Sequence, residues 1–66
     1  MQIQVNDAPL ELTTTLTLSE LLIKLNISPE GSALAVNQRI VPRECWDSQH
    51  LRQNDNLIIF QAIAGG

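Results

Sequence analysis

The chain opens with apolar residues at every second position. Residues 1–5 alternate methionine, isoleucine and valine with glutamine, and this period of two is typical of a strand with one buried face. A turn-forming Asn-Asp-Ala-Pro cluster occupies residues 6–9, and the alternation resumes over residues 10–13. The start of the chain therefore predicts an antiparallel hairpin.

A helix start is the best-marked feature of the pattern. Thr17 is followed three residues later by Glu20, the spacing of a capping box, in which each side chain accepts from the other's backbone N–H. Leu16 and Leu21 occupy the flanking positions of a hydrophobic staple. Together these signals predict a helix that begins at Leu18.

The body and the end of this helix are marked as well. Glu20 and Lys24 stand four residues apart and predict an ion pair on the exposed face. Asn26 can adopt a left-handed conformation and so end the helix. The apolar stripe expected to face the core consists of Leu18, Leu21, Leu22 and Leu25.

The pattern predicts a second hairpin after the helix. Residues 28–31 form a loop in this interpretation, because they combine serine, proline and glycine. A short apolar strand at residues 33–36 is joined through Asn-Gln at 37–38 to a strand over residues 39–41.

The last third of the chain predicts a short helical segment and a final strand. Pro42 starts the helical segment, and Trp46 is available to close the lower edge of the core. A turn at residues 54–56 leads into residues 57–60, which are apolar on both faces. This composition is typical of a strand with neighbours on either side, so we expect the last strand to be central.

The order of these elements defines an α+β fold. One main helix covers one face of a mixed sheet of about five strands, and the first strand can pair with the last in parallel. About fifty residues, including the helix, separate these two strands and give room for the crossover. The arrangement is a β-grasp, the ubiquitin-like architecture, formed by residues 1–66 as a single domain.

Composition limits the classes of partner. The chain has 66 residues, of which 44% are hydrophobic and 17% charged, which is too apolar for a disordered chain. Its formal net charge is −3 and its pI is near 4.7. Because this charge repels phosphates and anionic lipids, we expect neither nucleic acid nor a membrane surface as a partner.

The apolar stretches are too short for membrane insertion or export. The longest span four residues, against the ~18 that a membrane span requires. The first six residues hold no basic region and no long apolar core, so no secretory signal is expected. A cytoplasmic location follows as the expectation.

Reactive side chains are scarce. Cys45 is the only cysteine and His50 the only histidine, which excludes an internal disulfide and a Cys/His zinc cluster. A thiolate beside an imidazole is a working nucleophile, but no third residue is placed to orient this pair. We therefore expect a semi-buried structural cysteine, a solvated histidine and a protein that is not an enzyme by itself.

The C-terminal Gly65 and Gly66 are the remaining unusual feature. Their alternative interpretation is a frayed terminus. Glycine adds nothing to packing, and it suits a position where the backbone must approach another surface closely. Three extended residues reach about 10 Å beyond the sheet, enough to enter a partner's active site. A free carboxylate is a poor electrophile, so acyl chemistry at this end requires prior activation by a partner.

Three segments of the chain resemble one known family. They are the opening residues 1–3, the segment Leu-Ala-Val-Asn-Gln-Arg-Ile-Val-Pro-Arg-Glu at 34–44 with Trp46, and the closing Phe-Gln-Ala-Ile-Ala-Gly-Gly at 60–66. In these the chain is similar to ThiS, the sulfur carrier proteins of thiazole (thiamine) biosynthesis, which are β-grasp proteins. Cys45 matches no functional position of that family.

The resemblance implies a carrier function centred on Gly66. An E1-like adenylating enzyme of the ThiF type would use ATP to adenylate the Gly66 carboxylate, and sulfur from a cysteine desulfurase would convert it to a thiocarboxylate. The thiocarboxylate would supply thiazole synthase of the ThiG type with sulfur. The resemblance further implies no cofactor bound to the chain itself.

The resemblance also implies which residues meet the partners. The tail residues Ala64, Gly65 and Gly66 would enter the partner's active site. Alternation along the last strand puts Leu57 and Ile59 on one face and Ile58 and Phe60 on the other. Ubiquitin-like proteins place the residues corresponding to Leu57 and Ile59 under the helix, so Ile58 and Phe60 would lie on the open face. The apolar residues expected to contact partners are Ile58, Phe60, Ala62 and Ile63.

Three other functions remain open at this point. The small subunit of molybdopterin synthase shares the fold, the tail and the thiocarboxylate chemistry, and differs in its client enzyme. A ubiquitin-like modifier would form isopeptide bonds to lysines. A plain binding module would carry an inert tail.

Overall fold

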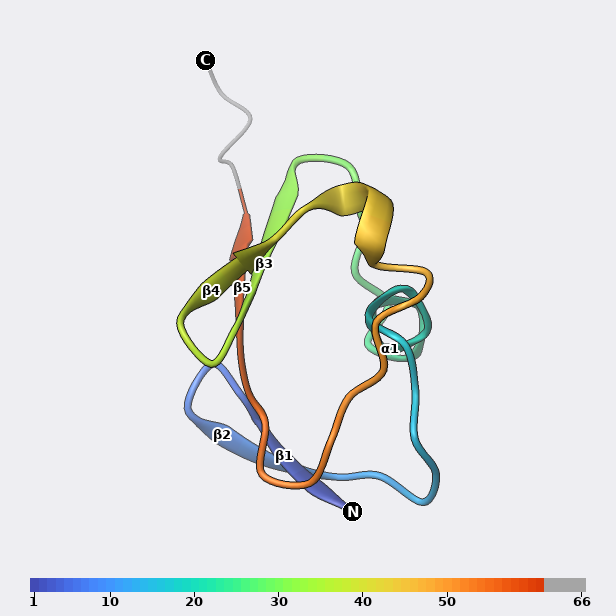
Figure 1. Ribbon diagram of the computed structural model, residues 1–66, viewed down its shortest axis with the longest axis vertical. Coiled ribbons are helices and arrows are strands. Elements are labelled where there is room, and N and C mark those ends of the chain that lie inside the picture. Colours follow the sequence, from blue (N-terminus) through green and yellow to red (C-terminus); the bar gives the residue numbers. More distant parts are fainter. Residues whose placement is uncertain (62–66) are drawn as a thin grey trace.

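Five strands form one mixed sheet in the order β2-β1-β5-β3-β4, and a helix lies across one face of this sheet (Figure 1). The structure is a computed structural model that describes residues 1–61. Its elements are β1 (Gln2–Val5), β2 (Ala8–Glu11), α1 (Leu18–Lys24), β3 (Ser32–Val36), β4 (Arg39–Val41), the 3-10 helix η1 (Arg43–Cys45) and β5 (Asn56–Gln61).

β5 is the central strand, as the sequence predicts. It runs parallel to β1, with Gln4 beside Asn56 and Val5 beside Leu57. On its other side it runs antiparallel to β3 over the full length of that strand. The parallel pairing of the first and last strands is thereby confirmed.

The first hairpin turn is shorter than expected. The sequence predicts a turn over residues 6–9, whereas Asn6 and Asp7 alone connect β1 to β2. Both have positive φ, at 50° and 68°. Two consecutive positive φ values match the twist of the flanking strands, and asparagine and aspartate tolerate this conformation better than most residues.

β2 therefore begins earlier than the predicted strand at residues 10–13. Pro9 lies inside β2, opposite Gln4. A proline is accepted at this position because β2 is an edge strand, where a missing N–H need not break the pairing.

The predicted capping box is confirmed at the start of α1. Thr17 Oγ1 accepts from the Glu20 N–H at 3.2 Å, and the Glu20 carboxylate accepts from the Thr17 N–H at 2.9 Å. The predicted ion pair between Glu20 and Lys24 is wrong. In the described part of the chain, the only ion pair joins the N-terminal ammonium to Glu11 at 3.4 Å. The capping box holds the Glu20 carboxylate toward the helix start, away from Lys24.

Asn26 ends α1 as predicted. Its φ is 63°, in the left-handed region. Its N–H donates to the carbonyl of Ile23 at 3.0 Å, and the N–H of Ile27 donates to the carbonyl of Leu22 at 2.9 Å. This pair of bonds is a Schellman motif, which satisfies carbonyls at the end of the helix.

The core fills the space between α1 and the covered face of the sheet. Of the predicted apolar stripe, three leucines are buried and Leu25 packs partly buried against them. The fully buried large side chains are Ile3, Leu18, Leu21, Leu22, Leu34 and Leu57.

Among residues 1–61, no helix is long and apolar enough to cross a membrane.

Trp46 packs into the core, as expected. It is buried directly after η1, and its indole N–H donates to the carbonyl of Val41 at 2.9 Å. The guanidinium of Arg43 lies 5.0 Å from the centre of the indole ring. The connection from β4 into η1 is thus fixed against the core by a packed and hydrogen-bonded tryptophan.

Two asparagines in the hairpin turns hold β5 from both sides. On the β1 side, Asn6 Oδ1 accepts from the backbone N–H of Ile59 at 2.8 Å. On the β3 side, Asn37 Oδ1 accepts from the backbone N–H of Asn56 at 3.0 Å. The two turns therefore determine where the central strand lies, and with it the start of the C-terminal tail.

Candidate functional site

The predicted tail follows the carboxyl end of β5 in the sequence. β5 ends at Gln61, at the opposite end of the sheet from the N-terminus (Figure 1). The predicted tail residues Ala64, Gly65 and Gly66 lie outside the described residues, as do Ala62 and Ile63 of the predicted partner interface. The site is therefore built from β5 and its neighbours.

The predicted alternation along β5 is confirmed. Leu57 and Ile59 are buried in the core. Ile58 and Phe60 face the other side of the sheet, where Ile58 is half-buried and Phe60 is 49% exposed. Phe60 is a large apolar side chain that the fold leaves in water, directly before the end of the central strand.

Strand register extends this exposed surface beyond β5. Ala35 of β3 lies between Ile58 of β5 and Ile40 of β4, and Ala33 lies beside Phe60. Ile40 is 66% exposed. These residues share one face over three strands, with Ala35 buried between its neighbours, and are here called the apolar patch: Ala33, Ala35, Ile40, Ile58 and Phe60.

Ile40 was missed by the sequence analysis. It is one residue in a strand of three, too short for its alternation to show which face it occupies. The signal lies in the pairing of the second hairpin, which places Ile40 beside Ala35. Once that register is known, Ile40 and Ile58 share a face.

The other half of the same face is polar apart from Pro9, which lies opposite Gln4. Gln4 of β1 lies beside Asn56 of β5, and Gln2 lies beside Glu11 of β2. The apolar patch is therefore confined to the half of the sheet formed by β5, β3 and β4. Exposed apolar area that is gathered on one side in this way is typical of a docking surface.

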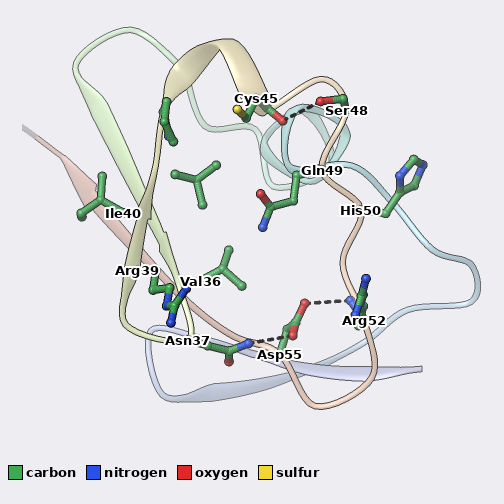
Figure 2. A pocket seen from close by; sticks show the side chains of 12 residues that line it. Val36, Asn37, Arg39, Ile40, Cys45, Ser48, Gln49, His50, Arg52 and Asp55 are labelled. Carbon is green, nitrogen blue, oxygen red and sulfur yellow. Dashed lines mark hydrogen bonds between the residues drawn. The ribbon is translucent and has the colours of Figure 1, made fainter.

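A groove lies elsewhere on the molecule, between the β3–β4 hairpin and the segment that follows η1 (Figure 2). Its volume is about 830 Å³. The amide of Gln49 points into it, whereas the side chain of Ile40, at its edge, points away from it. The buried Asp55 carboxylate on its wall accepts from Asn37 Nδ2 at 3.0 Å and from the Arg52 N–H at 2.8 Å, so this acid holds the loop together.

Cys45 and His50 both line this groove but are not brought together. Cys45 is half-buried at one end, and the exposed His50 ring points away from the groove (Figure 2). No hydrogen bond joins the two side chains within the described residues. The half-burial of Cys45 and the exposure of His50 match the expectation for these two side chains.

The fold and the site define a class of protein. A mixed five-stranded sheet with one covering helix is the β-grasp fold, and the sequence after its central strand closes on Gly-Gly. The family model described as the ThiS family matches residues 3–66. The chain belongs to the ThiS family.

Individual relatives agree with this assignment. The sulfur carrier protein ThiS of Escherichia coli (strain K12) is 44% identical over 66 residues, which cover 100% of both chains. The crystal structure of a thiamine biosynthesis protein (ThiS) from Geobacter metallireducens matches with a TM-score of 0.87 at 25% identity, covering 100% of both chains. An NMR structure of a thiamine biosynthesis protein from the same organism has a TM-score of 0.82 at 25% identity, covering 100% of this chain and 88% of that one.

Proposed function

We propose that this chain is a sulfur carrier of thiamine biosynthesis, with the carboxylate of Gly66 as the attachment point for sulfur. The observation that carries the proposal is its membership of the ThiS family over residues 3–66, together with the full-length similarity to the sulfur carrier protein of Escherichia coli. The terminal Gly65 and Gly66 supply an unhindered carboxylate. The chain is a carrier on which other proteins act, and it is not itself a catalyst.

The proposed chemistry proceeds by activation and displacement. An oxygen of the Gly66 carboxylate attacks the α-phosphorus of ATP, and pyrophosphate leaves. The outer sulfur of an enzyme persulfide, formed by the cysteine desulfurase, then attacks the acyl carbon and AMP leaves, which gives an acyl disulfide. A thiol attacks the other sulfur of this disulfide, so that a new disulfide forms and the thiocarboxylate leaves. The resulting thiocarboxylate is the form that delivers sulfur to thiazole synthase. ATP is bound and used by an E1-like adenylating enzyme, so the carrier itself needs no cofactor.

The apolar patch is the proposed docking surface for the adenylating enzyme. It lies on β5, the strand that leads into the tail, so a partner bound there would receive the C-terminus directly. Burying the exposed half of Phe60 is worth about 1–2 kcal/mol, or roughly tenfold in affinity. We propose Ala62 and Ile63 as further contacts, with Ala64, Gly65 and Gly66 entering the active site.

A pair of variants tests this surface. Phe60→Ala should weaken binding to the adenylating enzyme about tenfold while leaving the fold intact. The control is Ile23→Ala on α1, because Ile23 is 77% exposed and lies outside the patch. Titration calorimetry measures both affinities. Equal affinities for the two variants would contradict the proposed surface.

Turnover by the adenylating enzyme tests the function. With ATP and the purified adenylating enzyme, the full chain should support exchange of pyrophosphate into ATP. A chain lacking Gly66 should not, although its apolar patch is unchanged. Exchange that is equal for both chains, or absent with the full chain, would contradict the role of the Gly66 carboxylate.

The family match supports thiazole synthesis over the alternatives that share the fold. A molybdopterin synthase subunit would co-purify with a large synthase subunit, and a protein modifier would appear as lysine-linked conjugates. We expect co-purification with thiazole synthase instead. Co-purification therefore distinguishes thiazole synthase from molybdopterin synthase as the enzyme that receives the sulfur.

A further inference from the structure

The central strand β5 is paired unequally on its two sides. On the β3 side, the pairing extends to Gln61 at the end of the strand. On the β1 side, the register ends at Val5 beside Leu57. The last part of β5 therefore runs past the end of β1, with a neighbouring strand on one side only (Figure 1).

The first hairpin turn produces this difference. At Asn6 the chain leaves the sheet, and the Asn6 N–H donates to the carbonyl of Leu57 at 2.9 Å. Asn6 Oδ1 then accepts from the N–H of Ile59, also on the β1 side. Asn6 therefore makes the hydrogen bonds to β5 that one further residue of β1 would make, and β1 does not pair with β5 beyond this point.

Strand geometry identifies the backbone groups beyond this point. The N–H and C=O of one residue point to the same edge, and successive residues alternate between edges. Because Leu57 and Ile59 point toward β1, Gln61 does as well. Within residues 1–61, no hydrogen bond is formed by the carbonyl of Ile59 or the N–H of Gln61. These two groups form a short free edge at the start of the tail.

The outer edges of the sheet are better protected. β2 contains Pro9, which removes an N–H from its strand. β4 is only three residues long, and Pro42 follows it directly. Short strands and prolines are the usual ways of preventing unwanted pairing at an edge. The free edge of β5 carries no such protection, although it belongs to the central strand.

We propose that this free edge binds an extended segment of the enzyme that acts on the C-terminal carboxylate, as one added strand. The inference rests on the proposed function, which brings such an enzyme to this end of β5. A backbone carbonyl of the partner would accept from the Gln61 N–H, and a partner N–H would donate to the Ile59 carbonyl.

The added strand gives the carrier a fixed register. The apolar patch holds the partner by side-chain burial, which is not directional. Backbone pairing at Gln61 sets which residues of the tail point to which side, because a slip of one residue reverses every side chain. The free edge thereby orients the chain immediately before it enters the active site.

Substitution of Gln61 tests the donor directly. Gln61→Pro removes the N–H that points to the free edge, and it leaves the pairing of Phe60 with β3 in place. The extended conformation of Phe60 is the one that a following proline favours. The matched control Gln61→Ala changes the same side chain and keeps the N–H. We expect Gln61→Pro to bind the adenylating enzyme about fivefold more weakly than Gln61→Ala.

A chemically synthesised chain provides an independent variant. Replacing the Phe60–Gln61 peptide bond by an ester removes the same N–H without a proline ring, so it reports on the donor even if Gln61→Pro folds poorly. Supporting results are weaker binding by the ester or proline chain and unchanged binding by Gln61→Ala.

Each other outcome overturns the inference. Equal affinity of the ester chain and the full chain, with adenylation still occurring, would refute the added strand and leave the proposed function standing. A dimer of the free protein that the ester dissolves would show that a second copy occupies the edge. Failure of the unmodified chain to be adenylated at all would refute the proposed function and this inference with it.

Discussion

Asn6 combines a demanding backbone conformation with a long-range hydrogen bond, and replacing it should separate the two effects. Its φ is 50°, and its Oδ1 accepts from the Ile59 N–H, 53 residues away in the sequence, at 2.8 Å. Three substitutions remove these features in different combinations. Asn6→Asp keeps both, Asn6→Gly loses only the acceptor, and Asn6→Ala loses the acceptor and tolerates the positive φ poorly.

The magnitudes follow from the two contributions. Loss of the acceptor costs about 1 kcal/mol, because the Ile59 N–H is left without its partner. Alanine in the left-handed region adds about 1 kcal/mol. The expected losses are therefore ~0.5 kcal/mol or less for Asn6→Asp, ~1 for Asn6→Gly and ~2 for Asn6→Ala. For a domain of this size, 2 kcal/mol lowers the Tm by roughly 10 °C.

Urea unfolding measures this series conveniently, because Trp46 is the only tryptophan and is buried. Amide hydrogen exchange supplies the local readout: the Ile59 amide should exchange faster in Asn6→Gly than in Asn6→Asp. Equal stability of the alanine and aspartate variants, or unchanged exchange at Ile59, would refute the assignment of Asn6 as the residue that holds β5.

The remaining predictions concern other parts of the fold. Gln38 has a φ of 73° in the second hairpin turn, so Gln38→Gly should raise the free energy of unfolding by about 0.5–1 kcal/mol, measured as a higher urea midpoint; a lower midpoint would contradict this. Thr17→Ala removes the helix cap and should cost about 1 kcal/mol in thermal unfolding, and no change would argue against the capping box. Leu57→Ala empties a fully buried site and should cost about 3 kcal/mol, which lowers the Tm by roughly 15 °C; an unchanged Tm would contradict the packing described.

Much of the fold could be predicted from local signals. Alternation marked β1, apolar runs marked β3 and β5, and the capping box at Thr17 fixed the first residue of α1. The apolar run at residues 57–60 indicated a central strand, because a strand that is apolar on both faces is typical of one with neighbours on either side. These predictions hold because each depends on residues close together in the sequence.

The errors arose where tertiary context decides. Pro9 was assigned to a turn, because its acceptance in β2 depends on that strand being at the edge of the sheet. Glu20 and Lys24 have the spacing of an ion pair, but the capping box competes for the same carboxylate. Spacing alone cannot show which of the two interactions forms.

The candidate site was predicted in part for the same reason. Phe60 and Ile58 followed from alternation within one strand. Ile40 required the register between β4 and β3, and the role of Asn6 required knowing where β1 stops beside β5. Both depend on pairing between segments far apart in the sequence, which no local pattern records.

The central claim is that sulfur is carried on the Gly66 carboxylate. Intact-mass analysis of the protein, after incubation with the adenylating enzyme, ATP and a cysteine desulfurase with cysteine, tests it most directly. The account predicts a gain equal to the mass difference between sulfur and oxygen, localised to the C-terminal residue and absent from a chain that lacks Gly66. An unchanged mass, or a gain that maps to Cys45, would contradict it.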